Sequence, residues 1–339
     1  MNPIYWLLIY AVLASLVVFI SIKLSNYVDL LDKKTNVSGA LLGGILLAGV
    51  TSLPELFTSL TGTLIVGDNR LVLGNIIGSD FFDIVIFGVV YFLFFKKFTQ
   101  GKLGKQHYLT IMFTAFMLVA VTVAAFIFNK NGWLLGWFNP MSIVIIAIYV
   151  LSVVFTPKTE EKEEQDEVVD TKLTVKQIWI LLAIFSVFLI SASIGVTMVT
   201  EKVVEGFNIG HTFGGSLFLG VATSLPEVTA TISLCKKKNF NAAYGDILGS
   251  CVFNIIILAL ADAISFNAGP LYTITSDSFM LIIGTAFCLL LTLVSILFIR
   301  SKYFKNNVKS RVILYSIGAL LISSYLVYLV LATSGVQLI

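Results

Sequence analysis

Two copies of one polar pentapeptide carry the side chains of this chain that could do chemistry. Thr-Ser-Leu-Pro-Glu occurs at residues 51–55 and recurs letter for letter at 223–227. Each copy ends on an acid, Glu55 or Glu227, inside a long apolar stretch. Carboxylate and hydroxyl oxygens are the ligands that hard cations such as Ca²⁺ prefer. We therefore expect the two copies to bind a metal cation.

A second repeated motif follows each pentapeptide. Gly-Asn-Ile-Ile-Gly-Ser at 74–79 aligns with Gly-Asp-Ile-Leu-Gly-Ser at 245–250. Four residues after each serine comes a further polar residue, and residues four apart share one face of a helix. The two polar pairs are Ser79 with Asp83 and Ser250 with Asn254. The two glycines of each motif are spaced to let their helix approach a neighbour closely.

The composition indicates a membrane protein. Of 339 residues, 58% are apolar and 12% charged, and the mean hydropathy is +0.96, whereas a soluble domain has about 45–50% apolar and about 25% charged residues. Ten apolar stretches are near the length of about 20 residues that crosses a bilayer. They run over 3–22, 39–66, 71–95, 108–128, 140–155, 178–199, 212–234, 242–264, 279–299 and 312–332. The predicted fold class is an all-α, polytopic membrane protein, whose first stretch lacks the features of a signal peptide and is interpreted as a retained helix.

The motifs divide the chain into two five-helix halves. We assign residues 1–157 to the first half, with its repeat at about 36–95, and residues 177–339 to the second half, with its repeat at about 208–265. An odd number of helices per half turns the second half over in the membrane, so the repeats are predicted to be inverted. Inverted repeats are typical of secondary transporters, whose binding site lies near the bilayer midplane.

The basic residues predict the orientation. With the N-terminus outside, the inner loops hold 19 of the 22 Lys and Arg residues, and the outer loops hold Arg70, Lys130 and Lys202. Cytoplasmic loops carry such an excess. The interval 158–176 contains seven acids and four lysines and is therefore interpreted as a solvated cytoplasmic linker. We expect a multi-pass protein of the cell (plasma or inner) membrane.

Several acids fall at membrane depth. Those well inside the predicted helices are Glu55, Asp80, Asp83 and Glu227, while Asp246 and Asp262 fall towards the ends of the eighth stretch. A charge at the bilayer centre costs about 2.5–3.5 kcal/mol, and no Lys or Arg lies within these stretches. The acids are either protonated or neutralised by a cation from solution. For Asp80, which Cys251 replaces in the second repeat, an interhelical hydrogen bond and a direct ion contact are both open.

The repeated prolines favour the cation. Pro54 and Pro226 each lie inside a predicted spanning helix, and proline lacks an N–H and clashes with the carbonyl four residues back. The carbonyls expected to be released or loosened are those of Val50, Ala222, Ala48 and Gly220. Irregular backbone at this depth is tolerated where it lines a cavity. Carbonyl, hydroxyl and carboxylate oxygens would then form an all-oxygen ligand set.

Other classes of function are poorly supported. Three cysteines and two histidines provide neither a disulfide framework nor a zinc cage. An intramembrane enzyme would need a nucleophile paired with a histidine, or a histidine-based metal site, and the sequence indicates neither. A cation channel would more naturally build its filter as a ring of subunits. The sequence gives no indication of a cofactor, a nucleic-acid partner or an obligatory oligomer. His211, at the start of the seventh stretch, is either a pH sensor or a satisfied interfacial histidine.

With these motifs, the chain resembles the Na⁺/Ca²⁺ exchanger branch of the calcium/cation antiporter superfamily. The two Thr-Ser-Leu-Pro-Glu and the two Gly-x-Ile-x-Gly-Ser segments are similar to that family's α-repeats, and ten helices with a central linker extend the likeness to the whole chain. The resemblance implies that the first helix of each half slides against the rest. One departure concerns the polar residue four positions after each motif serine. This chain has Asp83 in the first repeat and Asn254 in the second, whereas microbial members of the family have Asn first and Asp second. The Gly-Asn-Ala-x-Glu motif of the proton-coupled branch is absent.

The resemblance also implies roles for individual residues. Glu55 and Glu227 would be paired Ca²⁺ ligands assisted by Thr51 and Thr223. The Na⁺ positions would be lined by Ser52, Ser224, Ser79 and Ser250 and by the backbone oxygens of Ala48 and Gly220. The implied activity is exchange of Ca²⁺ for Na⁺. The count of charges on Glu55, Glu227 and Asp83 adds the hypothesis of about three Na⁺ per Ca²⁺, which would make the exchange electrogenic. A Ca²⁺/H⁺ or other divalent-cation antiporter on the same frame is the alternative.

Overall fold

The computed structural model describes residues 3–34, 52–98, 103–104, 106–128, 139–155, 173–236, 238, 240–265 and 270–334. The regular elements in these ranges are helices. The first half contains α1 (Pro3–Lys34), α3 (Leu53–Thr61), the π-helix η2 (Gly62–Val66), α4 (Asn69–Phe98), α5 (Gln106–Val123), the π-helix η3 (Ala124–Phe128) and α6 (Pro140–Phe155). The second half contains α7 (Val175–Phe207), α8 (His211–Gly214), the π-helix η4 (Gly215–Gly220), α9 (Val221–Lys236), α10 (Phe240–Ile264), α11 (Ser276–Arg300) and α12 (Val308–Thr333).

The predicted apolar stretches are helical wherever they are described. Eight helical segments are long and apolar enough to cross a membrane, and Leu53–Val66 and Pro140–Phe155 are shorter apolar helices. The all-helical membrane fold is therefore confirmed. Residues 39–51 of the second stretch and residues 158–172 of the linker lie outside the described residues.

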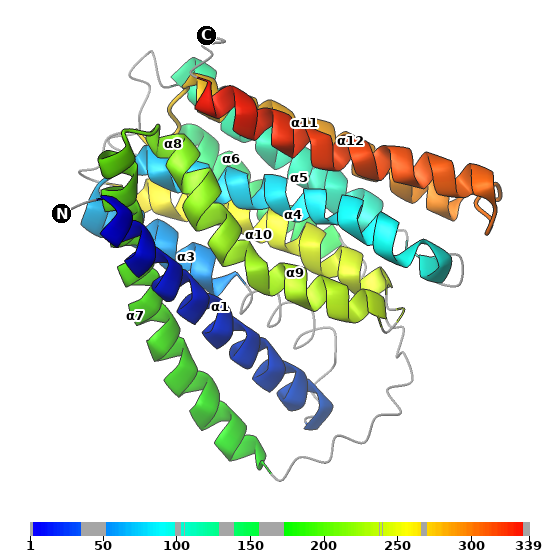
Figure 1. Ribbon diagram of the computed structural model, residues 1–339, viewed down its shortest axis with the longest axis horizontal. Coiled ribbons are helices and arrows are strands. Elements are labelled where there is room, and N and C mark those ends of the chain that lie inside the picture. Colours follow the sequence, from blue (N-terminus) through cyan, green and yellow to red (C-terminus); the bar gives the residue numbers. More distant parts are fainter. Residues whose placement is uncertain are drawn as a thin grey trace.

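The two helices that follow the pentapeptides occupy the centre of the molecule. In their most apolar windows, 78% of α4 and 67% of α10 are buried within the protein, against 28% for both α1 and α7. Figure 1 shows α4 in cyan and α10 in yellow in the middle, with α11 and α12 along one edge and α1 with α7 towards the opposite edge. The polar motifs of 74–79 and 245–250 are therefore carried into the interior.

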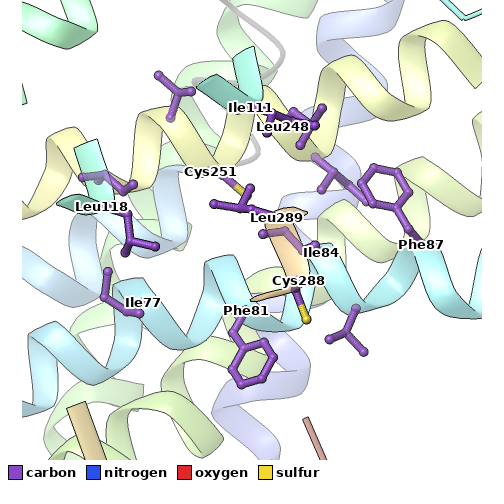
Figure 2. Packing of buried hydrophobic residues seen from close by; sticks show 14 of the residues in the cluster. Ile77, Phe81, Ile84, Phe87, Ile111, Leu118, Leu248, Cys251, Cys288 and Leu289 are labelled. Carbon is purple, nitrogen blue, oxygen red and sulfur yellow. The ribbon is translucent and has the colours of Figure 1, made fainter. Parts of the chain in front are cut away.

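The apolar core is divided in the same way. α1 and α7 share a cluster that includes Val17, Leu24 and Leu189 and meets Leu219 and Ala222 of the second repeat. A larger cluster joins α4, α5, α10, α11 and α12, and Figure 2 shows part of it around Cys251 and Leu289. The α1–α7 pair thus has an apolar core of its own, and it contacts the rest of the protein mainly through α3 and α9.

Glycines bring α4 against the backbone of η4 and α8. A Cβ built on Gly74 would clash with the backbone of Thr212, and one on Gly78 would lie 2.5 Å from the Cα atom of Ser216. Only glycine permits this separation, so the predicted close approach is found for the first glycine pair. The described residues offer no comparably close neighbour to Gly245 or Gly249.

Candidate functional site

The two prolines occupy different places in their helices. α3 begins at Leu53, so Pro54 lies in its first turn, where the missing N–H removes no helical hydrogen bond. In the second repeat Pro226 lies inside α9. The sequence places both prolines inside spanning helices, and within the described residues this holds for Pro226. The predicted ligands Ala48 and Thr51, together with Val50, lie outside the described residues.

The backbone before Pro226 is irregular, as the sequence predicts. The π-helix η4 ends at Gly220, directly before α9. The Gly220 carbonyl oxygen accepts hydrogen bonds from the Ser79 hydroxyl at 3.3 Å and from the Thr223 hydroxyl at 3.4 Å. This carbonyl therefore faces side-chain hydroxyls of both repeats and is positioned to serve as a cation ligand.

Three predicted acids are buried without a hydrogen-bond partner among the described residues. Glu55 on α3, Asp83 on α4 and Glu227 on α9 each have an exposed fraction of 0%. None of their six carboxylate oxygens has a hydrogen-bond partner among the described residues. Glu227 lies within electrostatic range of both Glu55 and Asp83, and Glu55 within range of Asp83. The interior thus holds a concentration of acids that a cation could neutralise.

The acids do not form a closed metal cage by themselves. In the part of the chain that the structure describes, no three Asp, Glu, His or Cys side chains converge closely enough to hold an ion. Six to eight oxygens surround Ca²⁺ in proteins. Hydroxyl and carbonyl oxygens would therefore have to complete the coordination of an ion held by Glu55 and Glu227.

Serine and threonine hydroxyls join the two repeats crosswise. Ser52, at the start of α3, lies 3.0 Å from Ser250 of α10, measured between hydroxyl oxygens. Ser79 of α4, which aligns with Ser250, lies 3.4 Å from the hydroxyl of Thr223 on α9, and Thr223 directly precedes Ser224, the residue that aligns with Ser52. Thr223 also lies beside Glu55. The predicted hydroxyl ligands of the two repeats therefore meet around the buried acids.

Polar residues that follow the two motif serines, Asp80 directly after Ser79 and Asn254 one turn after Ser250, are also brought together. The Asn254 side-chain amide donates to an Asp80 carboxylate oxygen at 3.0 Å, so Asp80 makes the interhelical hydrogen bond that was one of its two options. The bond directs the amide nitrogen of Asn254 to Asp80 and leaves its oxygen buried without a partner among the described residues. Asp83 lies beside Ser224 of α9.

Several polar residues near the site are not among the site residues predicted from the sequence. The Asn75 side-chain amide on α4 donates to the hydroxyls of Thr58 at 3.0 Å and Ser59 at 3.1 Å. Helical spacing could have found them, because Thr58 and Ser59 lie one turn after Glu55 and Asn75 lies one turn before Ser79.

The two acids placed towards the ends of the eighth stretch are both buried. Asp262 accepts hydrogen bonds from the Asn139 backbone N–H at 2.9 Å and from the Ser142 hydroxyl at 2.8 Å, and so anchors the start of α6. Asp246 has no such support, since neither of its carboxylate oxygens has a partner among the described residues.

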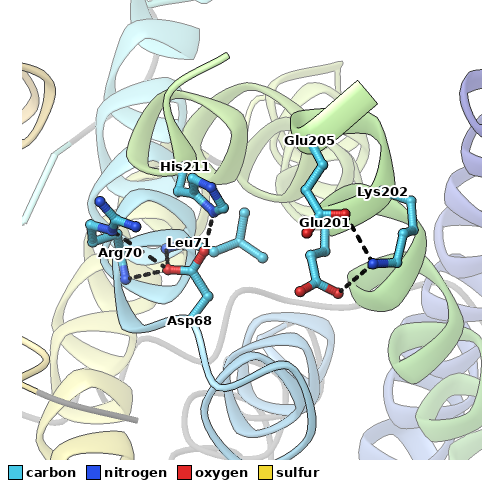
Figure 3. A network of polar contacts seen from close by, with 7 residues as sticks. All are labelled: Asp68, Arg70, Leu71, Glu201, Lys202, Glu205 and His211. Carbon is cyan, nitrogen blue, oxygen red and sulfur yellow. Dashed lines mark hydrogen bonds and ion pairs between the residues drawn. The ribbon is translucent and has the colours of Figure 1, made fainter. Parts of the chain in front are cut away.

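His211 lies beside Asp68 at the start of α8. Figure 3 shows its ring paired with Asp68, which also accepts hydrogen bonds from the backbone N–H groups of Arg70 and Leu71 at the start of α4. A separate surface pair, Lys202 with Glu205 at 3.0 Å, lies on α7. A histidine beside an acid is compatible with both interpretations of His211.

Comparisons with known proteins bear on the family and the fold. The family model described as "Sodium/calcium exchanger protein" matches residues 4–157 and 176–334. The inner membrane protein YrbG of Escherichia coli (strain K12) is 25% identical over 290 residues, which make up 81% of this chain and 85% of that protein.

Solved structures share the fold at low sequence identity. Native YfkE matches with a TM-score of 0.66 at 16% identity, over 95% of this chain and 91% of that chain. The H⁺/Ca²⁺ exchanger CAX matches with a TM-score of 0.60 at 16% identity, over 98% and 89%. The sodium-calcium exchanger NCX_Mj matches with a TM-score of 0.59 at 17% identity, over 99% and 100%. Since the family match extends over both halves, the chain belongs to the sodium/calcium exchanger protein family.

Proposed function

We propose that the chain is a secondary antiporter that exchanges Ca²⁺ for Na⁺ by alternating access. The observation that carries the proposal is the set of six carboxylate oxygens on Glu55, Asp83 and Glu227, which are buried and have no hydrogen-bond partner among the described residues. No Lys or Arg lies between residues 71 and 95 or between 203 and 235. A transported cation is the natural partner for charge held in this way.

The charges suggest why the two ions exclude each other. Glu55 and Glu227 together neutralise one Ca²⁺, with Asp83 protonated or outside the coordination shell. About three Na⁺ would instead neutralise all three acids, and they would use the same hydroxyl and carbonyl oxygens. Such an exchange moves one net charge across the membrane, which is worth about 2.3 kcal/mol per 100 mV.

The α1–α7 pair is the candidate for the moving part. Its apolar residues pack mainly in a cluster separate from the larger one, and the described contacts to the other helices include two side-chain hydrogen bonds. Tyr10 of α1 donates to the Phe218 carbonyl at 2.6 Å, and Thr197 of α7 lies 3.5 Å from the Thr58 carbonyl. A largely aliphatic interface is compatible with sliding, because its contacts are not directional.

A Ca²⁺/H⁺ antiporter is the second candidate. The chain is as similar in fold to the H⁺/Ca²⁺ exchanger CAX as to the sodium-calcium exchanger NCX_Mj, so the fold favours neither. The buried acids could also carry protons. The absence of Gly-Asn-Ala-x-Glu from the sequence favours Na⁺.

Placement in a cell (plasma or inner) membrane is part of the same proposal. It is supported by the likeness to an inner membrane protein and by the distribution of Lys and Arg, which puts the N-terminus outside and the linker in the cytoplasm. The proposed activity requires Ca²⁺, Na⁺ and a lipid bilayer, and neither a cofactor nor an oligomer.

Flux measurements separate the candidates. The purified protein is reconstituted into liposomes, and Na⁺, K⁺ and H⁺ gradients are imposed across the membrane in turn. Uptake of ⁴⁵Ca²⁺ is then followed with and without an imposed membrane potential. Na⁺-driven, voltage-sensitive uptake that is lost in Glu55→Gln is the expected result. Uptake driven by pH alone would establish the second candidate, and voltage-insensitive Na⁺-driven uptake would rule out the charge-moving stoichiometry.

A further inference from the structure

Asp246 is a buried acid to which the proposed ion site gives no role. It lies on α10 in the place that Asn75 holds on α4 when the two Gly-x-Ile-x-Gly-Ser motifs are aligned. Its exposed fraction is 7%, and neither carboxylate oxygen has a hydrogen-bond partner among the described residues. Burial of an ionised carboxylate is strongly unfavourable unless an opposite charge joins it.

In the first repeat the same position carries an amide whose nitrogen is hydrogen-bonded, although its oxygen has no partner among the described residues. There the Asn75 amide donates to two hydroxyls, those of Thr58 and Ser59. The pentapeptide alignment puts Ala230 and Thr231 at the corresponding positions of the second repeat.

In the second repeat the polar groups at these aligned positions lack a partner among the described residues. The Thr231 hydroxyl is fully buried and, like the Asp246 carboxylate, makes no hydrogen bond to the described residues. The amide that donates to two hydroxyls in the first repeat is thus replaced by a carboxylate and one hydroxyl. This combination offers only oxygen atoms, whereas the first repeat has an amide nitrogen that is already bonded.

Asp246 is close to the central site but lies to one side of it. It precedes Ser250 by one helical turn, about 6 Å at 1.5 Å per residue. It lies within electrostatic range of Glu227 and Asp83, and no Lys or Arg lies between residues 240 and 264. Since α10 begins at Phe240, Asp246 lies between the central site and the membrane side at which α10 begins.

We propose that Asp246 and Thr231 hold Na⁺ on its way between the central site and this side of the membrane. The inference rests on the proposed Na⁺/Ca²⁺ antiport. One carboxylate balances one monovalent charge, and two protein ligands leave the remaining positions to water. Ca²⁺, which takes six to eight oxygens, is less well served by this pair.

The site makes the transporter asymmetric. The corresponding position of the first repeat is Asn75, which carries no charge and whose amide is already bonded. In an inverted repeat that position faces the opposite side of the membrane. Na⁺ is therefore expected to be captured more tightly from the side at which α10 begins.

The test is the substitution Asp246→Asn, which gives the second repeat the residue of the first. The full chain is placed in liposomes in a known orientation, and Na⁺-dependent ⁴⁵Ca²⁺ flux is measured while Na⁺ is varied on one side at a time. The half-saturating Na⁺ concentration on the α10 side should rise by about tenfold or more, the scale on which a lost supporting contact lowers metal affinity. The value on the other side should not change.

Two further variants support the comparison. Asp262→Asn is the matched control, because it removes another acid from the same helix. The Asp262 carboxylate is already hydrogen-bonded to Asn139 and Ser142, so this variant should not change the half-saturating Na⁺ concentration on either side. Thr231→Val keeps the side-chain shape and should give a smaller shift on the α10 side. It also serves if Asp246→Asn does not fold.

The outcomes are distinguishable. Stabilisation of the purified protein by Ca²⁺ alone should persist in Asp246→Asn, because the central ligands are intact. Three results would overturn the separate Na⁺ site. They are loss of the Ca²⁺ stabilisation in Asp246→Asn, an equal rise of the half-saturating Na⁺ concentration on both sides, and no rise in either Asp246→Asn or Thr231→Val. A wild-type protein whose Ca²⁺ flux ignores Na⁺ on both sides would instead overturn the proposed antiport on which the site depends.

Discussion

Replacing Glu55 with Gln should stabilise the ion-free protein and abolish its response to Ca²⁺. The Glu55 side chain is fully buried, neither of its oxygens has a partner among the described residues, and its electrostatic neighbours include Asp83 and Glu227. Gln has nearly the same shape without the charge. The substitution therefore removes repulsion and the cost of burying a charge, and with them a ligand for the ion.

The size of the effect follows from this environment. A charge at the bilayer centre costs about 2.5–3.5 kcal/mol. At about 2.1 cal/mol/K of unfolding entropy per residue, 1 kcal/mol moves the unfolding temperature of a chain of 339 residues by about 1.4 °C. The ion-free variant should therefore unfold about 4–5 °C above the ion-free wild type. Ca²⁺ at 100 times its Kd should add about 2.7 kcal/mol to the wild type and nothing to the variant.

Thermal unfolding of the purified full chain at pH 8 measures both effects, first with a chelator and no Na⁺, and then with Ca²⁺. Glu205→Gln is the control, because the Glu205 side chain is 51% exposed in a surface pair with Lys202, and such pairs contribute about 0–1 kcal/mol. It should leave both the ion-free stability and the Ca²⁺ response unchanged. A Glu55→Gln protein that unfolds at a lower temperature in chelator and is still stabilised by Ca²⁺ would refute the reasoning.

Three other substitutions test the packing and polar contacts around the site. Gly74→Ala should destabilise the protein by about 1–3 kcal/mol in thermal unfolding, because its Cβ clashes with backbone; Gly245→Ala, whose Cβ lies 3.9 Å from the nearest described atom, should lose nothing, and equal losses would contradict the predicted asymmetry. Asn254→Leu should lower stability by about 1–3 kcal/mol, because Asp80 is left without its hydrogen-bond donor, and adding Asp80→Asn should recover part of that loss. Asp68→Ala should lower stability by about 1 kcal/mol, because it removes a side-chain cap from the start of α4, and an unchanged unfolding temperature would show that the cap contributes nothing.

The sequence was sufficient to predict the helices, and it also predicts the chemical character of the proposed site. In a bilayer each spanning segment must satisfy its backbone hydrogen bonds internally, so apolar length alone predicts where helices lie. The repeated pentapeptide and the acids far from any basic residue likewise predict a cation site, because their unfavourable burial can be read from their positions. Glu55 and Glu227 are buried as this argument requires.

Only the tertiary structure decided which polar groups meet. The bond between Asp80 and Asn254 joins residues 174 positions apart, and the periodicity of one helix does not report which helix it faces. Asp246 looks like an end-of-helix acid in the sequence, yet it is buried, because α10 lies in the middle of the bundle and is covered along most of its length. Local spacing sets the face of a helix on which a side chain lies, and packing decides whether that face meets a partner, lipid or an ion.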